Sequence, residues 1–148
     1  MIVDHGLYKE TLLRHYRQPH YKCDSALTDA DVVRRGANPR CGDEIEVGLY
    51  LDGEVLREVK FRGRGCSVCI ASASLMTEAV KGRTVAEAED LFRRFHAMLT
   101  EDGEPDDLGK LEALAGVRQI PIRVKCATLA WHTLNAAMDG ADDKVTTE

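Results

Sequence analysis

The sequence predicts an α+β domain in which a small three-stranded antiparallel sheet is covered by about five helices. The first observation is a strictly alternating segment at 44–51 that is followed, after Asp52 and Gly53, by a returning strand at 55–62. This is the pattern of a β-hairpin. The second observation is that apolar residues in other segments recur at steps of three and four, the period of amphipathic helices. One such core suits 148 residues, so we expect a single domain over residues 1–140.

The helices are placed by their apolar spacing and by capping residues. Asp4 and Ser67 are expected to be N-caps, and Thr84 with Glu87 forms the pattern of a capping box. Proline and glycine residues mark several of the helix ends. The predicted helices span residues 4–17, 67–80, 84–100, 108–116 and 121–139.

The hairpin decides which residues meet at one edge of the sheet. In an antiparallel pair the two outer ends lie side by side. Asp43 stands just before the first strand and Cys66 just after the second, so we expect Cys41, Asp43 and Cys66 to be neighbours. A further edge strand is expected at 31–35.

Composition and charge exclude several classes of function. The net charge is −5 and no concentrated basic block is present, which argues against nucleic acid as a partner. The apolar runs are far too short to span a membrane, and the first residues do not have the pattern of an export signal. We therefore expect a cytoplasmic protein without a membrane partner. Residues 141–148 are polar and acidic and are expected to form a disordered tail.

The cysteines point to metal or thiol chemistry. Five cysteines, an odd number in a chain without an export signal, do not suggest a disulfide framework. Cys41 lies in the polar turn Asn-Pro-Arg-Cys-Gly-Asp at 38–43, which offers no core to bury it. Three thiols and one carboxylate make a tetrahedral metal shell. Cys41, Asp43, Cys66 and Cys126 could supply it, for zinc or for iron.

Cys66 and Cys69 also form a Cys-x-x-Cys pair between a strand and a helix, which is the setting of a thioredoxin-type redox centre. Against this reading, the preceding strands form an antiparallel hairpin, and Cys41 would remain unexplained. Cys69 falls inside a predicted helix, where it either packs in the core or serves as a spare metal ligand. Cys23 is expected to be an incidental surface thiol.

The cationic residues near Cys126 have two interpretations. Arg123 and Lys125 either lie on a solvated helix start or tune the site, because a nearby positive charge favours the thiolate. Histidines are natural metal ligands, but these are expected to lie on solvated faces. They are His5, His15, His20, His96 and His132.

With these residues in view, the chain resembles the IscU/NifU-like family of iron–sulfur cluster assembly proteins, and most closely its SufU branch. The specific parts are 38–43 around Cys41, 65–68 with 71–76 around Cys66, and 123–131 around Cys126. Lys125, in place of a histidine, and the inserted helical segment at 95–117 favour the SufU branch. The chain departs from the family at Cys69, where a serine or another small residue is usual.

The resemblance implies a small antiparallel sheet covered by helices, with one zinc ion held by Cys41, Asp43, Cys66 and Cys126. It also implies a partner, a pyridoxal-phosphate cysteine desulfurase of the SufS type, and downstream Suf cluster-assembly proteins. In the family picture a partner histidine displaces Cys41 from zinc, and the freed thiolate accepts persulfide sulfur. The chain would then be a sulfurtransferase-like acceptor. Two alternatives stay open: a scaffold for a labile iron–sulfur cluster, and a purely structural zinc site.

Overall fold

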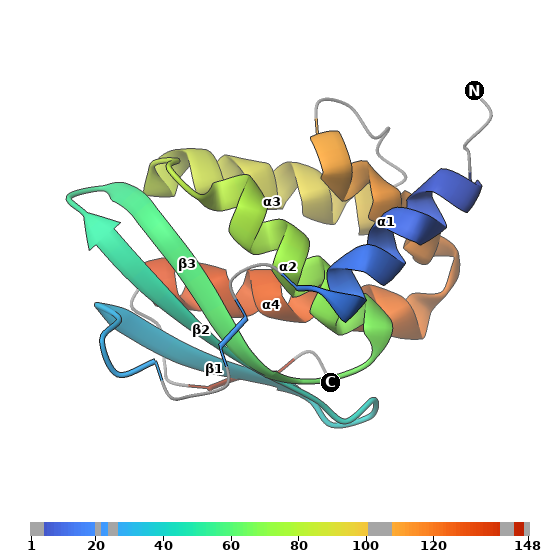
Figure 1. Cartoon of the computed structure of the whole chain (residues 1–148), viewed down its shortest axis with the longest axis horizontal. Helices are drawn as coiled ribbons and strands as arrows, with labels where there is room; N and C mark the ends of the chain where they lie inside the picture. The colour runs from blue at the N-terminus through green and yellow to red at the C-terminus, as the bar shows by residue number, and fades with distance from the viewer. Residues whose placement is uncertain (1–4, 20–21, 24–26, 101–107, 140–143, 147–148) are drawn as a thin grey trace.

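The computed structural model describes residues 5–19, 22–23, 27–100, 108–139 and 144–146 (Figure 1). Its elements confirm the predicted α+β class, with three antiparallel strands and five helical segments in the described part of the chain. In chain order they are α1 (His5–Arg17), β1 (Val32–Asn38), β2 (Asp43–Asp52), β3 (Val55–Arg64), α2 (Ser67–Val80), α3 (Val85–Thr100), the 3₁₀ helix η1 (Gly109–Gln119), α4 (Pro121–Asp139) and β4 (Lys144–Thr146).

The strands are ordered β3-β2-β1-β4. The first three are antiparallel, whereas β4 runs parallel to β1, with Val145 opposite Gly36. The expectation of a disordered tail over 141–148 is therefore wrong for residues 144–146, and the rest of that tail lies outside the described residues. The polar composition of the tail suggested disorder. Composition carries no information about the edge of β1, whose unpaired backbone groups can bind a short segment.

The predicted hairpin is present but its turn lies one residue later than expected. Asp52 pairs with Val55, so the two central residues are Gly53 and Glu54, with Gly53 at a φ of +62°. A register shift follows, because Tyr50 pairs with Glu58 whereas the next residue on β2 pairs with Leu56. Such a bulge changes which side chains face inward. Leu56 is accordingly buried, whereas an uninterrupted alternation that starts with Val55 facing inward would place Leu56 on the opposite face.

The helices lie on one face of the sheet (Figure 1). Helix α4 packs on β1 and β2, α2 packs on β3 and on α4, and α1 packs on α2. The capping box of α3 is confirmed, since the Thr84 N–H donates to Glu87 Oε1 at 2.9 Å and the Glu87 N–H donates to Thr84 Oγ1 at 3.1 Å. Ser67 is not the cap of α2, because Cys66 takes the N-cap position with an extended backbone. No helix in the described ranges is long and apolar enough to cross a membrane.

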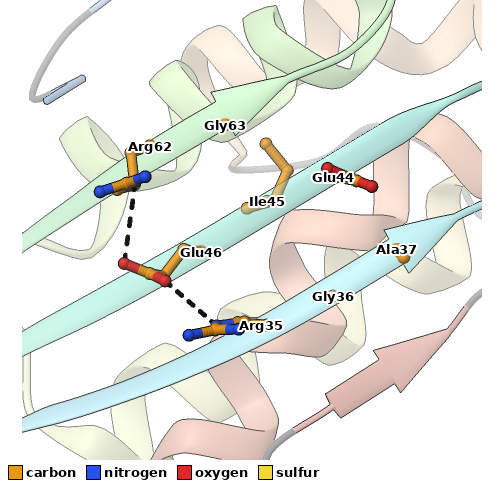
Figure 2. Close-up of a pocket in the computed structure, with 8 residues that line it drawn as sticks. All are labelled: Arg35, Gly36, Ala37, Glu44, Ile45, Glu46, Arg62 and Gly63. Carbon is orange, nitrogen blue, oxygen red and sulfur yellow. Dashed lines mark ion pairs between the residues drawn. The ribbon is translucent and has the colours of Figure 1, made fainter. Parts of the chain in front are cut away.

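The other face of the sheet carries ion pairs in a shallow hollow (Figure 2). Glu46 on β2 lies between two arginines, with Arg35 Nε on β1 at 3.3 Å and Arg62 Nε on β3 at 3.9 Å. Cross-strand pairs of opposite charge favour one strand register over a slipped one. This row therefore helps to fix the register that brings the ends of the three strands together at the Cys41 turn.

Trp131 on α4 is the largest fully buried side chain. It stacks on Phe95 at 4.9 Å between ring centroids and on Phe92 at 6.0 Å, and its Nε1 has no hydrogen-bond partner in the described structure. Trp131→Ala is expected to cost about 3–5 kcal/mol of unfolding free energy, because it opens a large cavity. Urea unfolding of the metal-free protein measures this. Trp131→Phe, which keeps a stacking ring and removes the unpaired N–H, should cost clearly less, and equal losses in the two variants would contradict this account.

Candidate metal centre

Three of the four predicted ligands converge at the end of the sheet. One ligand atom each of Cys41, Asp43 and Cys126 lies within 4.8 Å of the others. Cys41 belongs to the β1–β2 turn, Asp43 opens β2, and Cys126 lies in the early part of α4. Because these residues come from a turn, a strand and a helix that is distant in sequence, the cluster exists only in the folded chain.

The Cys41 thiol lies on a tight turn between two paired residues, Asn38 and Asp43. The Cys41 N–H donates to the Asn38 carbonyl at 3.2 Å, and Gly42 follows with a φ of +71°, a conformation that favours glycine. Cys41 is partly exposed. The turn thus presents this thiol to solvent beside two donors that are buried.

The Asp43 carboxylate is fully buried, and its two oxygens differ in their contacts. Oδ1 accepts the backbone N–H of Cys66 at 2.9 Å, whereas Oδ2 has no hydrogen-bond partner in the described structure. A buried oxygen without a partner is costly, and more so when it carries charge. An unpaired carboxylate oxygen beside two thiols has the chemistry of a metal ligand, so the cluster could hold a metal ion.

Gly65 leaves room for this carboxylate. A Cβ atom at Gly65 would lie 2.7 Å from Asp43 Oδ1, which is too close, and 3.1 Å from Cys69 Sγ, which is a tight contact. The glycine before the second cysteine is therefore required by the close approach of the chain to Asp43.

Cys66 lies at the same edge but is not part of the compact group of three. Its backbone N–H is bound to Asp43, as the hairpin argument predicted. Its thiol interacts with Arg123, whose pKa is raised chiefly by the charge on Cys66 and by a hydrogen bond with it, with a smaller effect of Cys126.

Cys126 is fully buried among acidic groups. Burial raises the pKa of its thiol, and contacts with Asp43, Cys41 and Cys66 raise it further. Its sulfur is 3.6 Å from the Ile122 carbonyl and 3.6 Å from Asn38 Nδ2. In the metal-free chain this thiol is therefore held neutral, and a cation at the site would reverse that preference.

The remaining cysteines and cations fall outside the cluster. Cys69 is fully buried in the hydrophobic core, and burial is the main cause that raises the pKa of its thiol, followed by the charges on Asp43 and on the neighbouring cysteines. Packing is thus the better supported reading of Cys69. Cys23 is partly exposed. Lys125 is half-buried on α4, and within the described structure its side chain makes no ion pair.

The expectation of solvated histidines is wrong for His15, which is 2% exposed. Its Nδ1 lies 2.7 Å from Ser74 Oγ on α2, so it docks α1 rather than facing solvent. His96 and His132 are partly buried and pack edge-to-face on Phe92. The side chains of His5 and His20 lie outside the described residues. Sequence reasoning also missed Asn38, which is fully buried against Cys126, because a polar residue in a polar turn gives no sign of burial.

Comparison with known proteins finds relatives that match most of the chain in sequence. The chain is 42% identical over 130 residues to the zinc-dependent sulfurtransferase SufU of Bacillus subtilis, with 86% of each chain covered. It is 37% identical over 134 residues to the iron-sulfur cluster assembly scaffold protein IscU of Streptococcus pyogenes, covering 89% of this chain and 82% of that one.

A solved structure supports the same assignment. The crystal structure described as an iron-sulfur cluster assembly scaffold protein for the SUF system from Fervidobacterium islandicum superposes with a TM-score of 0.78 at 32% identity, covering 92% of this chain and 99% of that one. Fold and site thus define an iron–sulfur cluster assembly protein. Residues 7–146 match the NifU-like N-terminal domain, and the chain belongs to that family. The resemblance to its SufU and IscU members is confirmed.

Proposed function

We propose that this protein is a zinc-dependent sulfur acceptor, which takes persulfide sulfur from a pyridoxal-phosphate cysteine desulfurase of the SufS type and relays it for iron–sulfur cluster assembly. The observation that carries the proposal is the unequal placement of the three clustered donors. Asp43 and Cys126 are buried, whereas Cys41 is partly exposed on a turn. A thiol that must meet a partner needs that exposure. The name of the Bacillus subtilis relative, a zinc-dependent sulfurtransferase, supports the same reading.

Cys41, Asp43, Cys66 and Cys126 would hold the zinc ion. The donor set of three sulfurs and one carboxylate suits zinc. The buried Oδ2 of Asp43 has no hydrogen-bond partner in the described structure, which supports a cation as its partner. Bound zinc would supply the positive charge that keeps the thiols deprotonated at neutral pH. Arg123 adds a further positive charge next to Cys66.

Sulfur acceptance then follows from the chemistry of Cys41. As a thiolate, Cys41 Sγ attacks the terminal sulfur of the desulfurase persulfide. A new sulfur–sulfur bond forms at Cys41 while the one on the desulfurase cysteine breaks, and the electron pair leaves on that cysteine as its thiolate. No oxidant or reductant is consumed, because one persulfide replaces another. Asp43 and Cys126 stay in place on β2 and α4 throughout.

A second candidate is a scaffold on which a labile iron–sulfur cluster is built and transferred. The observation that favours it is the 37% identity to the scaffold protein IscU of Streptococcus pyogenes. It would use the same three cysteines and Asp43. The two functions differ in what the purified chain carries, since a scaffold holds iron and sulfide together and an acceptor holds zinc and a persulfide.

The test is to incubate the zinc-loaded protein with a SufS-type desulfurase and cysteine. We expect about one zinc per chain, a rise in alanine output, and a mass increase of one sulfur atom that peptide mapping places on Cys41. A cluster that forms under anaerobic conditions and passes intact to an acceptor protein, with zinc having no effect, would favour the scaffold. Zinc with no response from the desulfurase would leave only a structural metal site.

A further inference from the structure

Among the residues that the structure describes, the buried amide of Asn38 makes one side-chain hydrogen bond, and its partner is a sulfur. Asn38 is the last residue of β1, is fully buried, and stands directly opposite Asp43 in the sheet. Its Nδ2 donates to Cys126 Sγ at 3.6 Å. Its Oδ1 is buried and has no hydrogen-bond partner in the described part of the chain.

An unpaired buried carbonyl costs about 1–3 kcal/mol. If Asn38 served only to hold the turn, an apolar side chain of the same shape would avoid that cost, because the turn itself is closed by the Asn38 backbone carbonyl and the Cys41 N–H. Any residue can supply that backbone contact. What only the side chain supplies is the N–H directed at Cys126.

The orientation of the amide suits a metal-bound sulfur. Cys126 Sγ accepts the Asn38 N–H and makes its own donor contact with the Ile122 carbonyl, so the Asn38 contact can persist when the sulfur binds a metal. Hydrogen bonds to a ligand atom orient it and tune its reactivity. The Asn38 contact thus matches Cys126 in the metal-loaded state, in which it is a ligand.

The N–H donors at the site are distributed unequally over the three thiols. Asn38 donates to Cys126, and the pKa of the Arg123 guanidinium is raised chiefly by Cys66 and less by Cys126. The hydrogen bond and this electrostatic effect both involve the two sulfurs other than Cys41. Within the described residues no side-chain N–H is directed at Cys41, the thiol on the exposed turn.

Resting on the proposed function, we propose that Asn38 is a positioning residue that holds the Cys126 sulfur on the metal and lowers its reactivity, so that Cys41 is the ligand that leaves. The sulfurs of Cys41 and Cys126 both lie within 4.8 Å of Asp43, and the Asn38 contact determines which of the two leaves the metal. Without it, Cys126 would compete with Cys41 for departure and for alkylating or sulfur-donating reagents.

The test compares Asn38→Leu with the wild type. Leucine has nearly the shape of asparagine but no N–H, and it also removes the unpaired carbonyl. We expect the metal-free variant to be at least as stable in urea, while zinc passes to an excess of a chromogenic chelator about tenfold faster. In the cobalt(II)-loaded protein the sulfur-to-cobalt absorption should move to longer wavelength, because a thiolate that has lost a hydrogen bond gives up its electron more easily.

A third measurement reads the selectivity directly. Limited alkylation of the zinc-loaded protein, followed by peptide mapping, should modify Cys41 well before Cys126 in the wild type and reduce that preference in Asn38→Leu. Thr133→Val is the matched control, since it removes another fully buried polar group, one that lies beneath Gly36 of the same strand. It should leave zinc release, the cobalt spectrum and the alkylation pattern unchanged.

Wild-type zinc release together with an unchanged cobalt spectrum in Asn38→Leu would overturn the proposal. So would failure of both Asn38→Leu and Asn38→Ala to fold without metal, because Asn38 would then be structural. These outcomes differ from failure of the proposed function, in which the wild-type chain itself holds no zinc or transfers no sulfur to Cys41.

Discussion

A Cys41→Ala variant is expected to lose sulfur acceptance completely, so that the alanine output of the desulfurase returns to the level of that enzyme alone. The reason is chemical, since alanine offers no sulfur on which a persulfide can form. We do not expect the other thiols of the site to replace it, because Cys126 is fully buried and Cys66, although partly exposed, lies outside the compact group of three donors. Alanine formed per minute, with and without the variant, is the measurement.

Cys23→Ala is the matched control for that experiment. Cys23 is also a partly exposed free cysteine, but its backbone N–H pairs with Phe61 of β3 and it does not belong to the metal-binding group. Its loss should leave zinc content and desulfurase stimulation unchanged. Full stimulation by Cys41→Ala, or equal loss in both variants, would show that Cys41 is not the acceptor.

The second large effect is expected from Asp43→Asn. Its effect on stability, relative to the wild type, should have opposite signs in the metal-free and in the zinc-loaded protein. Without metal, the wild type holds a fully buried carboxylate whose Oδ2 is unpaired. The amide removes that charge while its oxygen can still accept the Cys66 N–H. We therefore expect the metal-free variant to unfold at a urea concentration equal to or higher than that of the wild type.

With zinc the order should invert. An amide oxygen is a poor zinc ligand, and because even outer partners of a metal site affect affinity by about 10–100-fold, losing this ligand should weaken zinc binding by at least about 100-fold. At a fixed excess of zinc, a 100-fold weaker Kd removes about 2.7 kcal/mol of zinc-dependent stabilisation. Chelator competition gives the affinity, and urea unfolding in both states gives the two stabilities.

Asp31→Asn supplies the control for this inversion. The Asp31 carboxylate also accepts a backbone N–H, that of Leu51 at 2.7 Å, but it is exposed and is not one of the clustered metal-binding groups. The same substitution there should change the metal-free and zinc-loaded stabilities by the same small amount. A loss of metal-free stability in Asp43→Asn with zinc affinity retained would mean that the carboxylate serves the fold and not the metal.

Much of the site could be predicted from the sequence, because Cys41, Asp43 and Cys66 all lie at the ends of one β-hairpin. The NPRCGD turn fixes Cys41 and Asp43 two residues apart, and antiparallel pairing brings the chain after β3 back to that turn. The observed contact between the Cys66 N–H and Asp43 is the direct result. Periodicity located the helices, and α2 ends at the predicted Val80, whereas the helix predicted to end at Gly116 continues to Gln119 as the 3₁₀ helix η1.

Other features depended on neighbours that no local pattern reveals. The bulge on β3 replaced Val55 by Leu56 as the inward residue, and the free edge of β1 ordered Lys144–Thr146 in a tail predicted to be disordered. His15 looked like a surface histidine until α1 docked on Ser74 of α2. In the last two cases, a strand edge or a polar group is paired by a segment distant in the chain, whereas the bulge arises within the hairpin itself.

The sequence by itself determined the α+β class, the hairpin and the identity of the thiols, because alternation, helical period and turn chemistry act between near neighbours. Only the tertiary structure decided how the thiols differ. The packing of α4 on β1 brings Cys126 next to Asn38, 88 residues away, and buries both, while Cys41 keeps its exposure on the turn. Burial and hydrogen bonding to sulfur are properties of that packing, and they distinguish Cys126 from Cys41, the thiol that we propose as the sulfur acceptor.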